Sequence, residues 1–138
     1  MPVRDAFHEA VVKALLAAGW TITDDPLTLP FGVRTLFVDL GAQSPLAAEK
    51  AGRKIAVEVK SFLTKSPLPE WERAIGQYLL YSFLLRRLDP ERVLFLAVPD
   101  AVFRGLLSEP LSQDFIAEQA IKLIVVSKAD EVIEKWIE

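Results

Sequence analysis

The sequence contains no cysteine, and His8 is its only histidine. The absence of cysteine excludes disulfide bonds, thiolate metal sites and a cysteine nucleophile. A single histidine excludes a zinc site built from several imidazoles, and a Ser-His-Asp triad on any histidine other than His8 is also excluded. Any catalytic site away from His8 must therefore rely on side chains other than cysteine and histidine.

The sequence also lacks an excess of positive charge. Its formal net charge is -3 at pH 7, with 16 Lys and Arg residues against 19 Asp and Glu residues. This charge repels nucleic acid, so a nucleic-acid contact has to come from a local basic patch and will depend strongly on salt. Two clusters of basic residues could form such a patch. One consists of Lys50, Arg53 and Lys54 at a predicted turn, and the other of Lys60 and Lys65 at the far end of the following strand.

No apolar run is long enough to cross a bilayer, and the first residues lack the basic start and apolar run of a signal peptide. We therefore expect a cytoplasmic protein without a membrane contact. The composition that is present, 51% hydrophobic and 25% charged, is typical of a globular protein. A length of 138 residues favours a single domain over 1–138.

The spacing of apolar residues predicts a mixture of helices and strands. Apolar steps of three and four residues indicate helices, and β-branched or alternating runs indicate strands. The expected helices cover 5–18, 70–88, 100–107 and 111–119. The expected strands cover 20–23, 34–40, 46–50, 54–62, 92–98, 121–126 and 132–137. Turn residues fill 24–32, and a turn at 51–53 joins its two flanking strands as a hairpin. This order predicts a mixed α/β sheet with helices packed on its faces.

The strand 54–62 carries the most informative pattern. Successive side chains of a strand point to opposite faces, so the three β-branched residues at 55, 57 and 59 share an apolar face, and Glu58 and Lys60 share the other. A carboxylate can hold a hard divalent cation, and a neighbouring lysine can orient water or stabilise developing charge. The pattern favours a metal-assisted hydrolase, although a solvated Glu-Lys pair on an outer face has the same sequence.

Three further residues extend this pattern. Asp39 stands in Phe-Val-Asp-Leu, with 18 residues between it and Glu58. Gln77 and Tyr81 are four residues apart, so they share one face of the long helix. With Glu58 and Lys60 they resemble the PD-(D/E)xK nuclease superfamily, and the Gln-x-x-x-Tyr pair resembles its branch of RecB-type nucleases and Holliday-junction resolvases.

This resemblance implies a metal-dependent catalytic site. The carboxylates of Asp39 and Glu58 and the carbonyl oxygen of Val59 would hold Mg²⁺ or Mn²⁺. Lys60 would position the attacking water, and Gln77 would form hydrogen bonds near the site or to the DNA backbone.

Several assignments have alternatives. Glu49, in the predicted strand before the turn, competes with Asp39 as a metal ligand. Val38 stands where the motif name has proline, but only the aspartate of that pair is a ligand. His8 and Glu9 lie beside the apolar stripe of the first helix, where both are solvated or Glu9 reaches the rim of the site. Tyr81 is a further candidate through its place in the Gln-x-x-x-Tyr pair.

Several segments spread over nearly the whole chain resemble a narrower family, XisH. They are RDAFHEAV at 4–11, GWTIT at 19–23, DPL at 25–27, VDLGA at 38–42, AAEKAGRKIAVEVKSF at 47–62, GQY at 76–78, LAVP at 96–99 and KWI at 135–137. XisH proteins are cyanobacterial controlling factors for the excision of a DNA element by a site-specific recombinase, and they are usually encoded beside a smaller protein, XisI. The resemblance implies a restriction-endonuclease-like fold, a mixed β-sheet flanked by α-helices.

Two classes of function therefore remain open at the level of the sequence. The first is a metal-dependent DNA endonuclease, which the combination of Asp39, Glu58 and Lys60 favours. The second is a non-hydrolytic accessory protein that acts with an XisI-like protein on a recombinase–DNA complex, which the acidic net charge favours.

The long helix 70–88 follows a proline-containing segment at 66–69 that interrupts regular structure, and its apolar surface predicts a protein partner. It is apolar almost all round between residues 78 and 85. Its expected buried side consists of Trp71, Ala74, Ile75, Tyr78 and Leu79, and further apolar residues on the remaining circumference are Leu80, Tyr81, Phe83, Leu84, Leu85 and Leu88. One sheet face cannot bury all of them, so we expect an interface, most simply a homodimer, with an XisI-like protein as the alternative.

Overall fold

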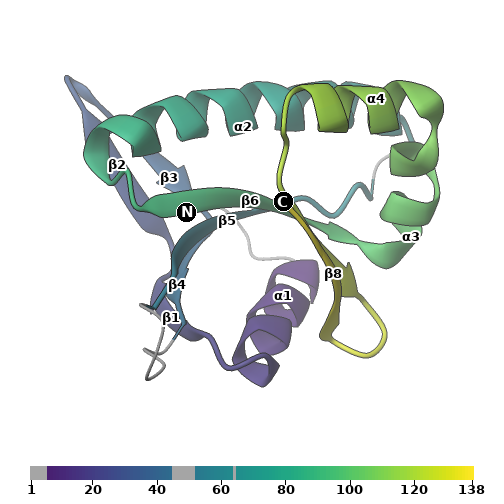
Figure 1. Cartoon of the computed structure of the whole chain (residues 1–138), viewed down its shortest axis with the longest axis horizontal. Helices are drawn as coiled ribbons and strands as arrows, with labels where there is room; N and C mark the ends of the chain where they lie inside the picture. The colour runs from purple at the N-terminus through teal and green to yellow at the C-terminus, as the bar shows by residue number, and fades with distance from the viewer. Residues whose placement is uncertain (1–5, 45–51, 64) are drawn as a thin grey trace.

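The computed structural model describes residues 6–44, 52–63 and 65–138. In chain order their elements are α1 (Ala6–Ala17), β1 (Thr21–Asp24), β2 (Leu27–Phe31), β3 (Arg34–Val38), β4 (Leu40–Gln43), β5 (Lys54–Val59), α2 (Pro67–Leu88), β6 (Arg92–Pro99), α3 (Asp100–Arg104), the 3-10 helix η1 (Leu106–Ser108), α4 (Pro110–Glu118), β7 (Leu123–Ser127) and β8 (Val132–Ile137). Figure 1 shows helices on both sides of one strongly curved sheet. The mixed α/β architecture predicted from the sequence is confirmed.

Within the described residues, six strands form the main sheet in the order β1-β4-β5-β6-β7-β8, and β2 and β3 form a separate hairpin. β5 lies near the centre, with β4 antiparallel on one edge and β6 parallel on the other. The sequence predicted a hairpin between 46–50 and 54–62. This prediction is wrong for β5, because its antiparallel neighbour is β4. The predicted strand 46–50 itself lies outside the described residues.

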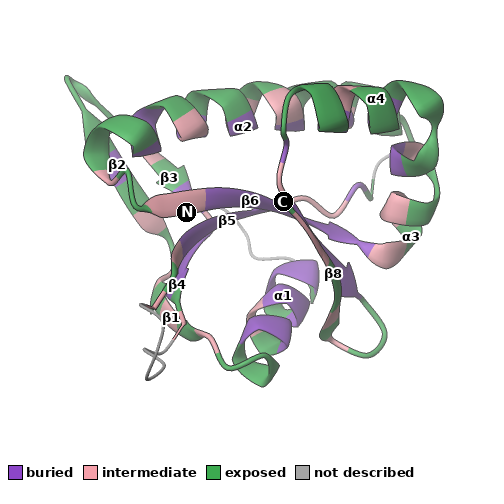
Figure 2. Cartoon of the chain, viewed as in Figure 1, coloured by how far each residue is buried: buried purple, intermediate pink, exposed green. Residues whose placement is uncertain are grey.

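The two faces of the central strand are buried under different helices. Ile55 and Val57 are fully buried in the cluster that includes the apolar side of α1. Ala56 is fully buried in the cluster that includes the inner side of α2. Figure 2 accordingly shows the middle of the sheet as buried, with exposed residues on the outer sides of the helices. The alternation of β5 thus places Glu58 on the α2 face of the sheet.

The region 24–32 is the main departure from the predicted elements. It contains β2, which pairs with β3 from Leu27↔Val38 to Phe31↔Arg34, although Pro26, Pro30 and Gly32 favour turns. Proline is tolerated in β2 because this strand has a partner on one side only. The predicted strand 34–40 is divided at Asp39, which lies in a bend where the chain passes from the hairpin to the main sheet.

α2 begins at Pro67, three residues before the predicted start. Prolines in the first turn of a helix do not break it, because the N–H groups there have no partner within the helix. The buried stripe follows steps of three and four residues through Trp71, Ala74, Tyr78, Tyr81 and Leu85. Leu79, which was expected on the buried side, falls off this stripe and is 48% exposed.

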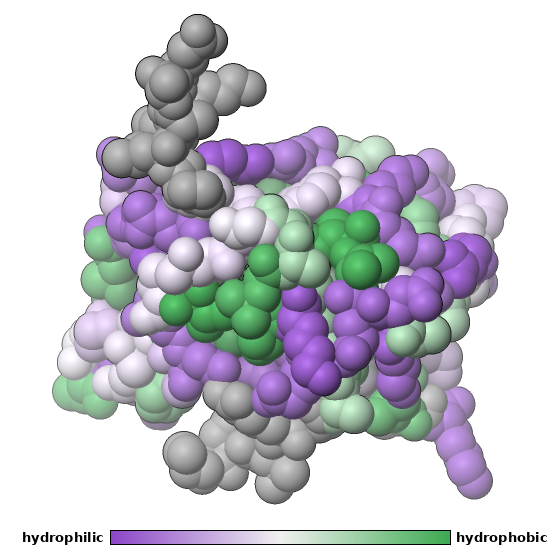
Figure 3. Space-filling view, turned by 90° about the horizontal axis from the view of Figure 1, so that it is seen from below, coloured by the Kyte–Doolittle hydropathy of each residue, from purple (hydrophilic) through white to green (hydrophobic). Residues whose placement is uncertain are grey.

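Apolar surface is not confined to α2. Figure 3 views the molecule from below, the side on which α1 lies in Figure 1, and shows an apolar patch bordered by hydrophilic side chains. Across the described part of the chain, no helix combines the length and the apolar character needed to cross a membrane.

Candidate active site

Asp39 and Glu58 hold each other in place through the backbone. The N–H of Val59 donates a hydrogen bond of 2.8 Å to Oδ2 of Asp39, and the N–H of Asp39 donates one of 3.2 Å to Oε1 of Glu58. The two carboxyl groups therefore lie side by side, one from the bend before β4 and the other from β5. The structure brings together the two carboxylates that the sequence analysis selected.

This arrangement follows from where the sheet ladder stops. β4 begins at Leu40, which lies opposite Val57, so the edge of β5 beyond Val57 has no strand beside it. The carboxylate of Asp39 fills this gap and accepts the N–H of Val59. The N–H and C=O of one strand residue point to the same edge, so the Val59 carbonyl also points toward Asp39. The next residue, Lys60, donates its N–H to Ala97 on the other side, at 3.0 Å.

Glu58 is buried, with 5% of its surface exposed. Burial, followed by the negative charge of Asp39 and a hydrogen bond between the two carboxyl groups, raises the pKa of Glu58 to about 8. The Lys60 ammonium, whose Nζ lies 3.6 Å from Oε2 of Glu58, acts in the opposite direction and lowers this pKa. Without a cation, Glu58 therefore carries a proton at neutral pH, as expected for two carboxyl groups that share a desolvated site.

Tyr81 faces the carboxyl pair from α2. Burial, and then the charges of Glu58 and Asp39, raise the pKa of Tyr81 to about 12, so its hydroxyl keeps its proton. Gln77 lies one helical turn earlier, and its Oε1 is buried without a hydrogen-bond partner among the described residues. A buried amide oxygen without a partner is costly, so Gln77 has an unused acceptor one turn from Tyr81.

The residues present suit a hard divalent cation. Two carboxylates and the carbonyl of Val59 offer oxygen ligands from one edge of β5, and such cations prefer oxygen. Within the described residues, no group of three or more His, Asp or Glu side chains is arranged so that it could hold a metal ion. A cation at this place would therefore take its remaining ligands from backbone oxygen, water or substrate.

The other sequence candidates lie elsewhere. Glu9 is exposed on α1, which packs on the face of the sheet opposite α2. Glu49 lies outside the described residues. His8 was expected to be solvated, but only 7% of it is exposed, and its Nε2 lies 3.2 Å from Oδ1 of Asp25. The carboxylate explains the burial, because it supplies a partner that the sequence around His8 does not reveal.

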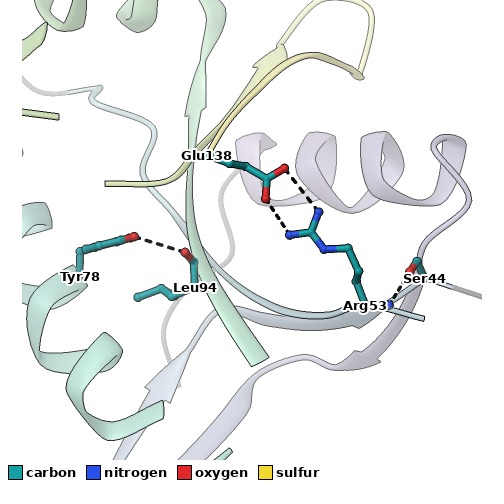
Figure 4. Close-up of polar contacts among 5 residues, drawn as sticks. All are labelled: Ser44, Arg53, Tyr78, Leu94 and Glu138. Carbon is teal, nitrogen blue, oxygen red and sulfur yellow. Dashed lines mark hydrogen bonds and ion pairs between the residues drawn. The ribbon is translucent and has the colours of Figure 1, made fainter. Parts of the chain in front are cut away.

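The basic cluster at the start of β5 is largely neutralised. Nη2 of Arg53 lies 2.7 Å from Oε1 of Glu138 (Figure 4), and Nζ of Lys54 lies 2.8 Å from Oδ2 of Asp89. These ion pairs hold the pKa values of both carboxyl groups below their ordinary range. Lys50, the third member of the cluster, lies outside the described residues. Arg53 and Lys54 therefore offer less positive charge to DNA than the sequence suggested.

The fold and the site together define a class: a mixed α/β protein with a paired Asp and buried Glu and a lysine at the edge of its central strand. The chain belongs to the XisH family, because the model of that family, described as "XisH protein", matches residues 1–134. The family resemblance stated from the sequence is thereby confirmed.

Two solved structures are similar over almost the whole chain. One is an XisH family protein from Nostoc punctiforme PCC 73102, with 41% identity, a TM-score of 0.87, and coverage of 97% of this chain and 100% of that chain. The other is an fdxN element excision controlling factor protein from Anabaena variabilis, with 42% identity, a TM-score of 0.88, and coverage of 98% and 100%. No curated protein matches the chain.

Proposed function

We propose that this chain is an excision controlling factor of the XisH type, and that it hydrolyses DNA phosphodiesters with Mg²⁺ or Mn²⁺ on a restriction-endonuclease-like fold. The first part follows the similar Anabaena protein, whose name describes that role. The observation that carries the second part is the Asp39–Glu58 pair beside Lys60, in which Glu58 is buried and Asp39 is half-buried. Holding a buried carboxyl group next to a second one is costly, and a divalent cation would offset that cost.

The ligands of the cation would be the carboxylates of Asp39 and Glu58 and the carbonyl oxygen of Val59. Once bound, such a cation lowers the pKa of a water ligand and neutralises charge on the phosphate. Glu58 has to lose its proton first, because its pKa of about 8 keeps it neutral at physiological pH in the free protein.

Three side chains around the pair have complementary roles. The Lys60 ammonium, 3.6 Å from Glu58, orients the attacking water and stabilises negative charge that develops on the phosphate. The hydroxyl of Tyr81 keeps its proton, so it would be available to donate a hydrogen bond to a bound phosphate. The unpartnered Oε1 of Gln77 accepts a hydrogen bond from a water or a nucleotide group.

DNA would approach the side of the sheet where β5 ends. Lys60 and the exposed Lys65 lie there, whereas Arg53 and Lys54 at the other end are paired with carboxylates. With a net charge of -3 on the whole chain, this contact would be weak and would weaken further as salt is raised.

A cleavage assay tests this proposal. Plasmid and branched DNA are incubated with the protein and Mg²⁺ or Mn²⁺, and parallel samples contain EDTA. Glu58→Gln and Asp39→Asn should abolish cleavage, whereas Glu72→Gln, an exposed residue of α2, should cleave like the unmodified protein. Cleavage that persists in EDTA, or an active Glu58→Gln protein, would refute the role of the carboxyl pair.

A second candidate function is a non-hydrolytic accessory role in a complex. The observation that favours it is the apolar surface on the outer side of α2, where Leu79, Leu80, Phe83 and Leu88 are each at least 39% exposed. Phe31 of the hairpin lies against Phe83, with ring centroids 6.5 Å apart, so the surface continues from α2 onto β2. Monomers rarely expose apolar groups in such a continuous area.

The simplest occupant of this surface is a second copy of the chain, and an XisI-like protein is the alternative. Sedimentation of the purified chain at tens of micromolar distinguishes them. A dimer that Phe83→Asp converts to a monomer supports the homodimer, and Leu16→Asp on α1 serves as the matched control. A pure monomer would rule out the homodimer and leave the hetero-partner.

A further inference from the structure

A cavity of about 360 Å³ lies beside the C-terminal half of α2, between that helix, the first residues of β6 and the segment before β7. Each of these three places contributes a basic residue to its lining: Arg86 from α2, Arg92 from β6 and Lys122 from the segment. No Asp or Glu is among the described lining residues. A local excess of positive charge is notable in a chain whose net charge is -3.

Two of the three cations are available to a ligand. Arg92 is already engaged, because its Nε lies 3.2 Å from Oδ2 of Asp89 and its Nη1 donates a hydrogen bond of 3.0 Å to the carbonyl of Ile55. Among the described residues, neither the Arg86 guanidinium nor the Lys122 ammonium forms an ion pair. Lys122 also contributes a smaller electrostatic effect that helps to lower the pKa of Glu138.

The inner end of the cavity is held by a fixed set of hydrogen bonds. The Tyr78 hydroxyl donates to the carbonyl of Leu94 at 3.4 Å (Figure 4) and accepts the backbone N–H of Lys122 at 3.0 Å. Ser82 also forms a hydrogen bond with this hydroxyl. The contacts tie α2 to β6 and to the segment before β7, so the cations are presented from a rigid frame. Leu94 and Val93 supply apolar wall beside the polar groups.

This cavity is distinct from the candidate active site. The polar side chains that line it from α2 are spaced by four residues, at Tyr78, Ser82 and Arg86, with Leu79 and Leu85 beside them. Tyr81, which faces the carboxyl pair, is not among the described lining residues. On β6, Arg92 lies opposite Lys54, and Glu58 lies opposite residue 96, which is about 13 Å further along the strand. α2 thus serves two polar sites on the same face of the sheet.

We propose that this cavity binds the phosphate of a nucleotide, either a free mononucleotide or one within a DNA strand. Arg86 and Lys122 match a phosphate in charge and hydrogen-bond donors, and Arg92 adds a third positive group at the wall. The cavity volume is within the range of small-molecule sites, and the apolar wall can receive a base. The binding requires no catalysis and no metal, so it does not depend on the function proposed above.

Binding can be measured in EDTA on the full chain, with backbone amide resonances as the readout. The probes are deoxyadenosine monophosphate, inorganic phosphate and a short single-stranded DNA. We expect the mononucleotide to shift the resonances of Tyr78, Ser82 and Lys122 and to bind more tightly than inorganic phosphate. Arg86→Gln and Lys122→Gln should each weaken binding about tenfold, because each removes a charged hydrogen-bond donor.

Arg87→Gln is the matched control, because Arg87 is adjacent to Arg86 but stacks over the Phe83 ring at 4.9 Å and does not line the cavity. It should change the dissociation constant less than twofold. Binding of the short DNA with no binding of the mononucleotide would identify a DNA strand as the source of the phosphate. Absence of shifts with all probes, an equal effect of Arg87→Gln, or equal affinity for inorganic phosphate would overturn the proposal. Glu58→Gln should bind the mononucleotide normally, which separates this result from the outcome of the cleavage assay.

Discussion

The two ends of β5 differ in how their charges are balanced. At its start, each carboxylate has a basic partner: Glu138 is paired with Arg53, and Asp89 is shared by Lys54 and Arg92. At its end, two carboxyl groups lie beside a single lysine, and Glu58 is buried. In the first arrangement, here called the balanced end, both carboxylates have a cationic partner, which is consistent with a structural role. In the second, here called the unbalanced end, two carboxyl groups share one lysine, so Glu58 keeps its proton at neutral pH until a cation replaces it.

The strongest way to test this contrast is to remove one carboxylate at the unbalanced end. Glu58→Gln should reduce the affinity for Mn²⁺ at least about a hundredfold, because it removes a charged ligand from a site with few of them. The metal-free protein should keep or gain stability, since glutamine resembles the protonated Glu58. Calorimetric titration with Mn²⁺ and thermal melting in EDTA measure the two effects. A clear loss of stability in EDTA would instead show that Glu58 is a structural partner of Lys60.

The stability of the metal-free protein should depend on pH through Glu58, at the unbalanced end of β5. The pKa of Glu58 is raised to about 8 in the folded protein, so the folded chain binds a proton that the unfolded chain has lost above about pH 4.5. Its contribution to stability is therefore present at low pH and is lost as the pH rises through 8, with a slope of up to about 1.4 kcal/mol per pH unit. Melting curves in EDTA between pH 5 and 9 should show this fall for the unmodified protein relative to Glu58→Gln.

Metal binding should follow the opposite course. Deprotonation of Glu58 has to accompany binding, so the affinity for Mn²⁺ should rise about tenfold per pH unit below pH 8 and level off above it. A pH-independent affinity between 6 and 8 would contradict a proton on this pair.

Lys60 allows a smaller test. Its ammonium lowers the pKa of Glu58, so Lys60→Met should raise that pKa further and move the midpoint of metal binding to higher pH. The affinity at high pH should change little or increase, because the variant also removes a positive charge near the cation. A readout of binding rather than cleavage keeps this effect separate from any role of Lys60 in orienting water. Lys65→Met, at an exposed position nearby, is the matched control.

Much of this contrast could be predicted from local sequence. The alternation of 54–60 placed Glu58 and Lys60 on one face, and the apolar steps of the long helix placed Gln77 one turn from Tyr81. Asp39 was selected as well, but its position in a bend between the hairpin and the main sheet was not predicted. The turn-forming residues in 24–32 concealed β2, so the hairpin itself was not expected. Only the position of the bend explains why its carboxylate caps the N–H of Val59.

The balanced end could not be predicted at all. Arg53 and Glu138 are 85 residues apart in the chain, so no local sequence pattern indicates this pair. The same holds elsewhere in the fold for His8 and Asp25, which are 17 residues apart. Such contacts depend on how the strands are ordered in the sheet, and a set of predicted elements does not fix that order. The basic turn therefore looked like a nucleic-acid patch, although its partners lie at the end of β8 and after α2.

The smallest effect should come from breaking the balanced end. Arg53 and Glu138 are each more than 40% exposed, so water and salt screen their attraction even though the contact is short. We expect Arg53→Gln to cost at most about 1 kcal/mol, less in high salt, and to leave Mn²⁺ affinity unchanged. The Arg53 guanidinium also lies 5.9 Å from the centre of the Phe95 ring, so a single substitution mixes two contacts. A double-mutant cycle with Glu138→Gln, measured by urea denaturation, isolates the ion pair. A coupling energy well above 1 kcal/mol, or a change in Mn²⁺ affinity, would mean that the two ends of β5 are linked rather than independent.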